Sequence, residues 1–183
     1  MRVYFWGTRG SLPASITAET IRTKIIKAIK ETGGRQFSND EEIAYFVDTN
    51  LPFPLKGSYG NNTPCIEIRG GAEYVICDAG TGLRDMGNNY VKLVEQGRRE
   101  KNAVFNILVS HCHWDHIQGF PFFTPAYVPG NKVKIYGFHK EIESVFINQQ
   151  NAPYFPVPLK NMKSDIEFIV LTEGEEYEIG GFR

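Results

Sequence analysis

The feature that most constrains the fold is an apolar run at residues 104–109, VFNILV, which leads directly into a cluster of histidines. An almost continuously apolar run is typical of a strand in a sheet that is covered on both faces. A strand with one face exposed to solvent instead alternates between apolar and polar residues. Shorter apolar segments, glycine turns and stretches with helical spacing lie on either side of it. The sequence therefore predicts an α+β fold in which helices pack on a sheet.

The remaining elements follow from periodicity and from cap and turn residues. Strands are expected at residues 2–6, 65–69, 74–77, 133–136, 166–171 and 177–179. Helices are expected after Thr17, after a Ser38/Glu41 capping box, after the glycine turn at 79–82, and at 140–148. The second of these helices should bury Ile43, Phe46 and Val47, and residues 50–62 should form a loop.

Length and composition favour one soluble domain. A chain of 183 residues with 42% hydrophobic residues is long enough for one core, so 1–183 is taken as a single domain with a helical insertion at about 17–56. The net charge of -1 gives no overall attraction to nucleic acid or membrane, although it leaves room for a local basic patch. No signal peptide is evident at the start of the chain, so we expect a cytoplasmic protein without a membrane partner. The cysteines are expected to be buried free thiols.

The residues with the clearest chemistry are His111, His113, Asp115 and His116, which lie within six positions. Imidazole nitrogens and carboxylate oxygens are ligands for divalent ions such as zinc or manganese, and a loop after a strand can aim several of them at one point. Two neighbouring ions would acidify a water shared between them and so provide a nucleophile at neutral pH. Ordinary surface histidines are the alternative. Cys112 should face away from the cluster, and His139 is expected to be a capping or surface residue.

Residues 111–116, HCHWDH, match the pattern H-x-H-x-D-H, and at this point the chain resembles the metallo-β-lactamase superfamily. The segments FWGTRGSLP, YGNNTPCIEI, CDAGTGLRDMG and SHCHWDHIQGFPFFTPAYVPGN extend the resemblance over most of the chain. They are similar to the branch that includes ribonuclease Z and class II cyclic-nucleotide phosphodiesterases. The resemblance implies an αβ/βα sandwich of two sheets with a site for two divalent metal ions, zinc first and manganese or iron as alternatives.

The resemblance also implies roles for individual residues. His111 and His113 would bind the first metal ion, and Asp115, the expected catalytic residue, would bind the second with His116. Asp78 would orient a ligand or a water from beside the site, or else simply cap its turn. Gly7, Arg9 and Asn62 would border the same cleft. Four aromatic residues are expected to form core or cleft wall: Trp114, Phe120, Phe122 and Phe123.

The sequence departs from the family pattern downstream of the cluster. Complete members carry two further histidines and a bridging aspartate, but no histidine follows His139. We therefore expect a domain truncated at the C-terminus, with one apolar sheet face uncovered and a homodimer or another association through that face. The expected function is a phosphodiesterase acting on a small-molecule or nucleotide substrate. The alternatives are a carboxylic ester or lactone hydrolase, and an inactive domain that acts through association.

Overall fold

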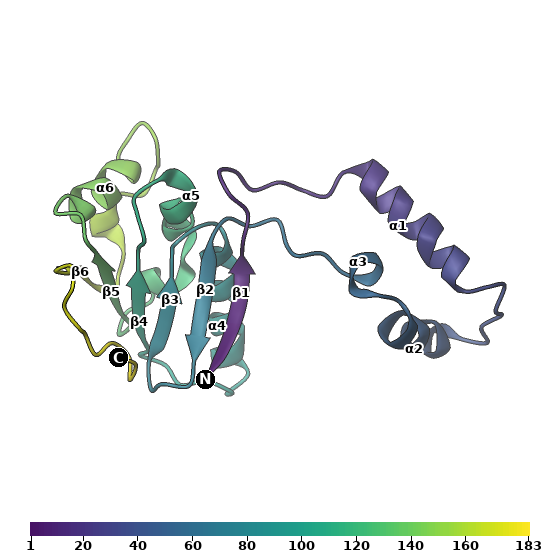
Figure 1. Cartoon of the computed structure of the whole chain (residues 1–183). Helices are drawn as coiled ribbons and strands as arrows, with labels where there is room; N and C mark the ends of the chain where they lie inside the picture. The colour runs from purple at the N-terminus through teal and green to yellow at the C-terminus, as the bar shows by residue number, and fades with distance from the viewer. The chain divides into compact units, whose positions relative to one another are not determined.

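The computed structural model describes all 183 residues, which form two compact units (Figure 1). The sheet unit comprises Met1–Pro13 and Asn62–Arg183, and the insertion unit comprises Ala14–Asn61. No helix in either unit combines the length and the apolar character that crossing a bilayer requires. Each unit is described by itself below.

The sheet unit contains one six-stranded mixed sheet in the order β1-β2-β3-β4-β5-β6. Its strands are β1 (Arg2–Gly7), β2 (Cys65–Arg69), β3 (Tyr74–Cys77), β4 (Val104–Leu108), β5 (Lys132–Gly137) and β6 (Asp165–Val170). The β1–β2 and β2–β3 pairs are antiparallel, whereas the three pairs from β3 to β6 are parallel. The fold is therefore mixed α/β, and the six strands agree with the expected positions to within one or two residues.

The helices of the sheet unit connect the parallel strands and cover one face of the sheet. They are α4 (Gly82–Glu95), α5 (Trp114–Ile117) and α6 (Ile142–Gln149), with short 3₁₀ turns at Phe120–Phe122, Thr124–Tyr127 and Leu159–Asn161. The register places Ile76, Ile107 and Ile135 side by side on this face. They pack in one core cluster with Leu83 of α4 and Phe146 of α6. This core fixes the ends of the central strands, where the histidine cluster lies.

The opposite face of the sheet is covered in part by the C-terminal residues. Ile179 packs with Tyr136 and Leu108, and a side chain at Gly180 would overlap Val75. This cover explains the continuous burial at the centre of β4. Farther along the same face, Phe5 of β1 is 68% exposed. The apolar surface expected on this face is thus present at its β1 end.

One expectation about this unit is wrong. Residues 177–179 do not form a strand, because the chain turns back at Gly180 and Gly181 and leaves only an isolated bridge between Ile179 and Phe182. Both glycines have positive φ, which ends an extended segment. The single sheet with its helices on one side corresponds to one half of the sandwich, as expected for a truncated domain.

The insertion unit is built from α1 (Ala18–Glu31), α2 (Asp40–Asn50) and the short α3 (Phe53–Lys56). Thr17 caps α1 as expected, since its hydroxyl accepts from Thr20 N at 3.2 Å.

The predicted start of α2 is one residue too early. Asn39 is the cap and accepts from Glu42 N at 2.9 Å, while Glu42 accepts from Ser38 N. Asparagine at this position satisfies the same orphan N–H groups that serine would. Helix α3 interrupts the loop expected at 50–62, and Ile43 is 44% exposed rather than buried, whereas Phe46 is buried against Phe37.

Candidate functional site

Two loops at one edge of the sheet carry the candidate site. Because β3 and β4 are parallel neighbours, both strands end at the same edge. Asp78 follows β3 directly, and Ser110 to His116 follow β4. Asp78 N donates to Leu108 O at 2.8 Å and holds the two strand ends together. Asp78 has φ 64°, a left-handed conformation that aspartate tolerates better than most residues.

Backbone contacts clamp the histidine loop onto the Asp78 turn. Ala79 N donates to His116 O at 2.7 Å, and Gly119 N donates to Ala79 O at 2.9 Å. A Cβ at Gly119 would lie 1.9 Å from Gly80 O, and one at Gly80 would lie 2.4 Å from Asp115 O. The two glycines therefore let the chains approach closely enough to position the site residues.

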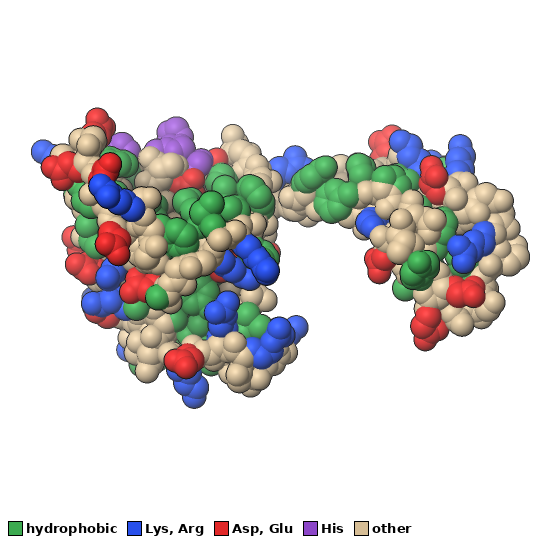
Figure 2. All heavy atoms as spheres, turned by 60° about the horizontal axis from the view of Figure 1, so that its bottom comes forward, with side chains coloured by type: hydrophobic (Ala, Val, Ile, Leu, Met, Phe, Trp, Pro, Cys, Tyr) green, Lys and Arg blue, Asp and Glu red, His purple; other side chains and the backbone are tan.

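The four predicted side chains and Asp78 come together at this edge, where histidine atoms are visible on the surface in Figure 2. His111 Nε2 lies 3.1 Å from His113 Nδ1, and the rings of His111 and His116 have centroids 4.0 Å apart. His116 lies between two carboxylates, with Nδ1 2.9 Å from Asp78 and Nε2 3.5 Å from Asp115. The cluster is thus a set of mutually contacting side chains rather than scattered surface histidines.

Asp115 is held in its ionised form by its surroundings. Ser11 N donates to Asp115 Oδ2 at 2.8 Å. This hydrogen bond, with smaller contributions from the nearby imidazoles of His116 and His111, lowers the pKa of Asp115 below its ordinary value. Sequence reasoning missed Ser11, because its contribution comes from the backbone; the only available signal was its place in the glycine-containing loop after β1.

Asp78 is itself fixed by the neighbouring serine. Ser110 N and Ser110 Oγ both donate to Asp78 Oδ1 at 2.8 Å, and Asp78 Oδ2 faces His116 Nδ1. A carboxylate bound in this way favours a proton on Nδ1 of His116 and leaves Nε2 free to accept or to bind an ion. Ser110 was also missed, although it directly precedes the motif.

The nitrogen and oxygen atoms of the cluster are of the type that binds divalent metal ions, and two pairs of them have a suitable separation. Two ligands of one tetrahedral zinc ion with bonds of about 2.0–2.1 Å lie roughly 3.3 Å apart. The separations between His111 and His113, 3.1 Å, and between Asp115 and His116, 3.5 Å, are close to this value. No group of three or more His, Cys, Asp or Glu side chains is arranged to hold an ion. The structure therefore shows two pairs of side chains at a suitable spacing and no completed metal site.

Asn62 and Arg9, two of the residues predicted to border the cleft, make no hydrogen bond to the histidine cluster with their side chains. Asn62 Nδ2 donates to Asp85 at 2.7 Å, and Asn62 Oδ1 accepts from Thr81 Oγ1 at 3.1 Å. The backbone carbonyl of Asn62 accepts from Thr8 N and Arg9 N. Asn62 thus connects the loop after β1 to the start of α4, and Arg9 is exposed without a side-chain hydrogen bond.

The aromatic residues near the motif divide into two groups. Phe120 and Phe123 are fully buried, as expected for core, but Trp114 is 80% exposed and Phe122 is also exposed. Trp114 is the first residue of the single-turn helix α5, whose inner side is occupied by Ile117. Trp114 and Phe122 are therefore not core residues, whereas the other expected role, the wall of a cleft, fits the hollow that both of them line. Cys112 also lines this hollow, which has a volume of about 590 Å³.

The three cysteines are free, and burial raises the pKa of each thiol. Because a thiolate is the reactive form, we expect labelling by Ellman's reagent at neutral pH to be slow in the native protein, Cys112 included. Unfolding in urea should release all three thiols for rapid labelling. Rapid native labelling of one thiol, mapped to Cys112 by mass spectrometry, would contradict this expectation.

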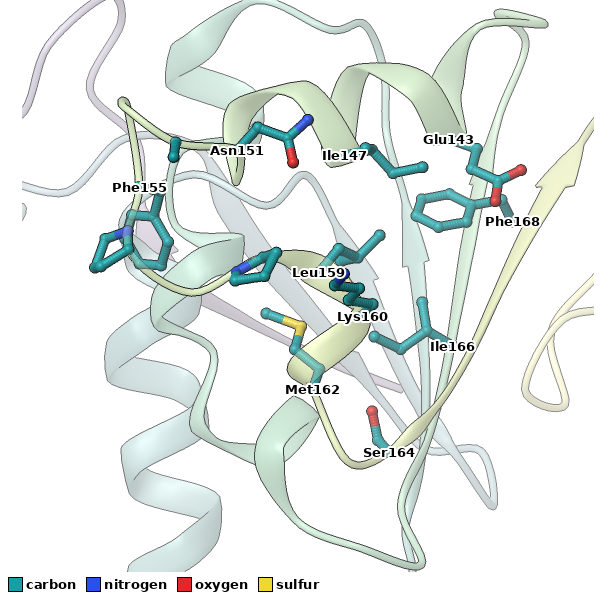
Figure 3. A pocket seen from close by; sticks show the side chains of 13 residues that line it. Glu143, Ile147, Asn151, Phe155, Leu159, Lys160, Met162, Ser164, Ile166 and Phe168 are labelled. Carbon is teal, nitrogen blue, oxygen red and sulfur yellow. The ribbon is translucent and has the colours of Figure 1, made fainter.

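A large cavity lies away from the histidine cluster. A hollow of about 730 Å³ lies between α6, β6 and residues 151–164, and Figure 3 shows its mainly apolar lining. Ile147 and Phe168 lie on one side, and Leu159 and Met162 on the other. None of the cluster residues lines this cavity. Its position gives no direct support to chemistry at the strand ends.

Comparisons with known proteins give a partial structural similarity. No family model matches the chain, and neither does any curated protein sequence. Among solved structures, a Thermotoga maritima protein assigned provisionally to the metallo-β-lactamases is 18% identical, with a TM-score of 0.37 over 66% of this chain and 53% of that one. The metallo-β-lactamase fold protein YhfI from Bacillus subtilis is 17% identical, with a TM-score of 0.39 over 69% of this chain and 43% of that one. The chain thus spans about half the length of these structures.

Proposed function

We propose that the chain carries part of the site of a metal-dependent hydrolase that acts on phosphodiesters. The observation that supports this proposal is the convergence of three imidazoles and two carboxylates from two loops at one sheet edge. Such crowding of nitrogen and oxygen donors is typical of sites for divalent ions.

His111 with His113, and Asp115 with His116, are the two pairs that would hold the ions, with zinc first and manganese or iron as alternatives. When bound, such ions supply Lewis acidity and make water acidic enough to act as a nucleophile near neutral pH. Asp115 is the proposed catalytic residue of the chain, because the N–H of Ser11 keeps its carboxylate ionised and oriented. Asp78, held by Ser110, favours the tautomer of His116 that carries its proton on Nδ1. Nε2, the nitrogen that faces Asp115, is then free to bind an ion.

A second candidate is a domain that acts through association. The absence of any three-ligand group favours it, because two ligands hold a zinc ion less firmly than the three or four usual in proteins. The exposed β1 end of the sheet, including Phe5, is the apolar surface through which a second copy would bind. Association with a second copy would then supply the further ligands that this chain does not contribute.

Metal content and turnover test the proposal together. We expect the purified chain to bind zinc or manganese and to hydrolyse bis(4-nitrophenyl) phosphate. A matched assay with 4-nitrophenyl butyrate measures ester hydrolysis, and faster turnover of the ester would reassign the substrate class. A metal content near zero with no turnover of either compound would refute the proposed enzyme and leave the second candidate.

The role of Asp78 gives a separate prediction. Replacing Asp78 with alanine removes the partner of His116 Nδ1, so we expect zinc affinity and hydrolysis to fall about 10–100-fold. Asp165→Ala is the matched control, since that carboxylate pairs with Lys132 at the other end of the sheet unit's strands. Equal zinc affinity in the Asp78 variant, measured by calorimetry, would show that the carboxylate only caps its turn.

A further inference from the structure

Helix α1 of the insertion unit carries an apolar stripe that no residue covers. Ile21, Ile25 and Ile29 recur every four residues and are 47%, 53% and 64% exposed. Residues at this spacing lie on one face of a helix. None of the residues of α1 is buried, so the stripe is open along its whole length.

The polar side of α1, by contrast, faces its own unit. Lys24 Nζ donates to Gly57 O, and Thr20 and Lys24 line a shallow hollow together with Pro54 and Leu55. An amphipathic helix in a globular unit normally turns its apolar stripe inward and its charges outward. Here the orientation is reversed, and hydrophobic atoms are visible on the surface of this unit in Figure 2.

The charges of α1 indicate which partner the stripe suits. The helix has four basic residues and two acidic ones, although the whole chain is nearly neutral. Arg22 and Lys30 follow Ile21 and Ile29 directly along the helix, so cations lie beside the apolar residues. An apolar stripe with neighbouring lysine and arginine is the pattern of helices that lie in the interface of an anionic bilayer.

We propose that α1 binds the surface of an anionic membrane, with the isoleucine stripe at the boundary between headgroups and acyl chains. Arg22 and Lys30 pair with the anionic headgroups. A second copy of the chain is a poorer occupant, because a helix of 14 residues is only about 21 Å long. Two such stripes form a contact smaller than the roughly 1,200–2,000 Å² that stable interfaces bury.

Vesicle binding by the full chain tests this proposal and is independent of hydrolysis. We expect co-sedimentation with phosphatidylcholine vesicles that contain about 30% phosphatidylserine, and little with phosphatidylcholine alone. The double variant Ile25→Ser, Ile29→Ser should lower the bound fraction at least about tenfold. Arg22→Gln with Lys30→Gln should lower it severalfold, and about 0.5 M salt should have a similar effect.

Matched controls separate this effect from misfolding. Tyr45→Ser removes a 66% exposed apolar side chain from α2, and Lys101→Gln with Lys140→Gln removes two exposed charges from the sheet unit; neither should alter binding. Circular dichroism checks that every variant is folded. Absence of vesicle binding, or equal binding to neutral vesicles, would overturn the proposal. Self-association in sedimentation velocity that the isoleucine variant abolishes, without vesicle binding, would instead assign the stripe to a second copy.

Discussion

Alanine at Asp115 is expected to reduce hydrolysis of bis(4-nitrophenyl) phosphate roughly a thousandfold. Loss of the carboxylate removes one of the two proposed ligands of its ion and leaves His116 without its partner. Metal ions contribute several kcal/mol to stabilising the transition state, and each 1.4 kcal/mol is about a factor of ten in rate. His113→Ala should have a similar effect, because it breaks the pair with His111. Steady-state rates and zinc content, measured for each variant, check this expectation.

The fourth histidine provides the matched control. His139 is exposed in the turn after β5, and its side chain makes no hydrogen bond. His139→Ala should therefore keep both the rate and the metal content of the unaltered chain. If Asp115→Ala and His113→Ala also kept their full rate, the measured hydrolysis would not originate at the histidine cluster, and the proposed function would be wrong.

Alanine at Gly119 should destabilise the sheet unit by about 2–3 kcal/mol and weaken the site at the same time. Its added Cβ would lie 1.9 Å from Gly80 O, so the backbone of one loop must move away from the other. Overpacking of this kind typically costs about 1–3 kcal/mol, and here the obstructing atom is backbone rather than a flexible side chain. Urea unfolding followed by circular dichroism measures the change in the free energy of unfolding.

Gly10 is a suitable control for this substitution. A Cβ at Gly10 meets nothing within 4 Å, so Gly10→Ala should leave the free energy of unfolding almost unchanged. Equal stability of the two variants would show that the two loops accommodate a side chain at Gly119 without a cost in folding free energy, contrary to this expectation. A loss of zinc binding in Gly119→Ala without a loss of stability would indicate a purely local effect on the loops.

Much of the fold could be predicted because it depends on local patterns. The alternation in residues 65–69 and the apolar run before the histidines set strands that the structure confirms as β2 and β4. The sequence identifies Thr17 as a helix cap, because it precedes a segment in which apolar residues recur at helical spacing, and the structure confirms it. The errors at 38–42 and 177–179 arose where two neighbouring residues could serve as caps, or where glycines ended an extended segment.

The candidate site was predictable only in part. The histidine motif is contiguous, so its members had to lie close together wherever the loop was placed. Asp78 came from the family resemblance, and its contact with His116 requires β3 and β4 to be parallel neighbours. The metal roles of these residues stay predictions, because no group of three or more His, Cys, Asp or Glu side chains is arranged to hold an ion.

The sequence by itself determined the order of the six strands, the cap of α1 and the residues whose chemistry suits metal ions. These properties depend on side-chain chemistry and on periodicity over a few residues. Only the tertiary structure decided that Ser11 N reaches Asp115, that Gly119 packs on Gly80, and that the stripe of α1 faces outward. Each of these depends on contacts between segments far apart in the chain or on which face of an element is covered. Local pattern does not encode such contacts, because they arise only when the sheet and its loops pack together.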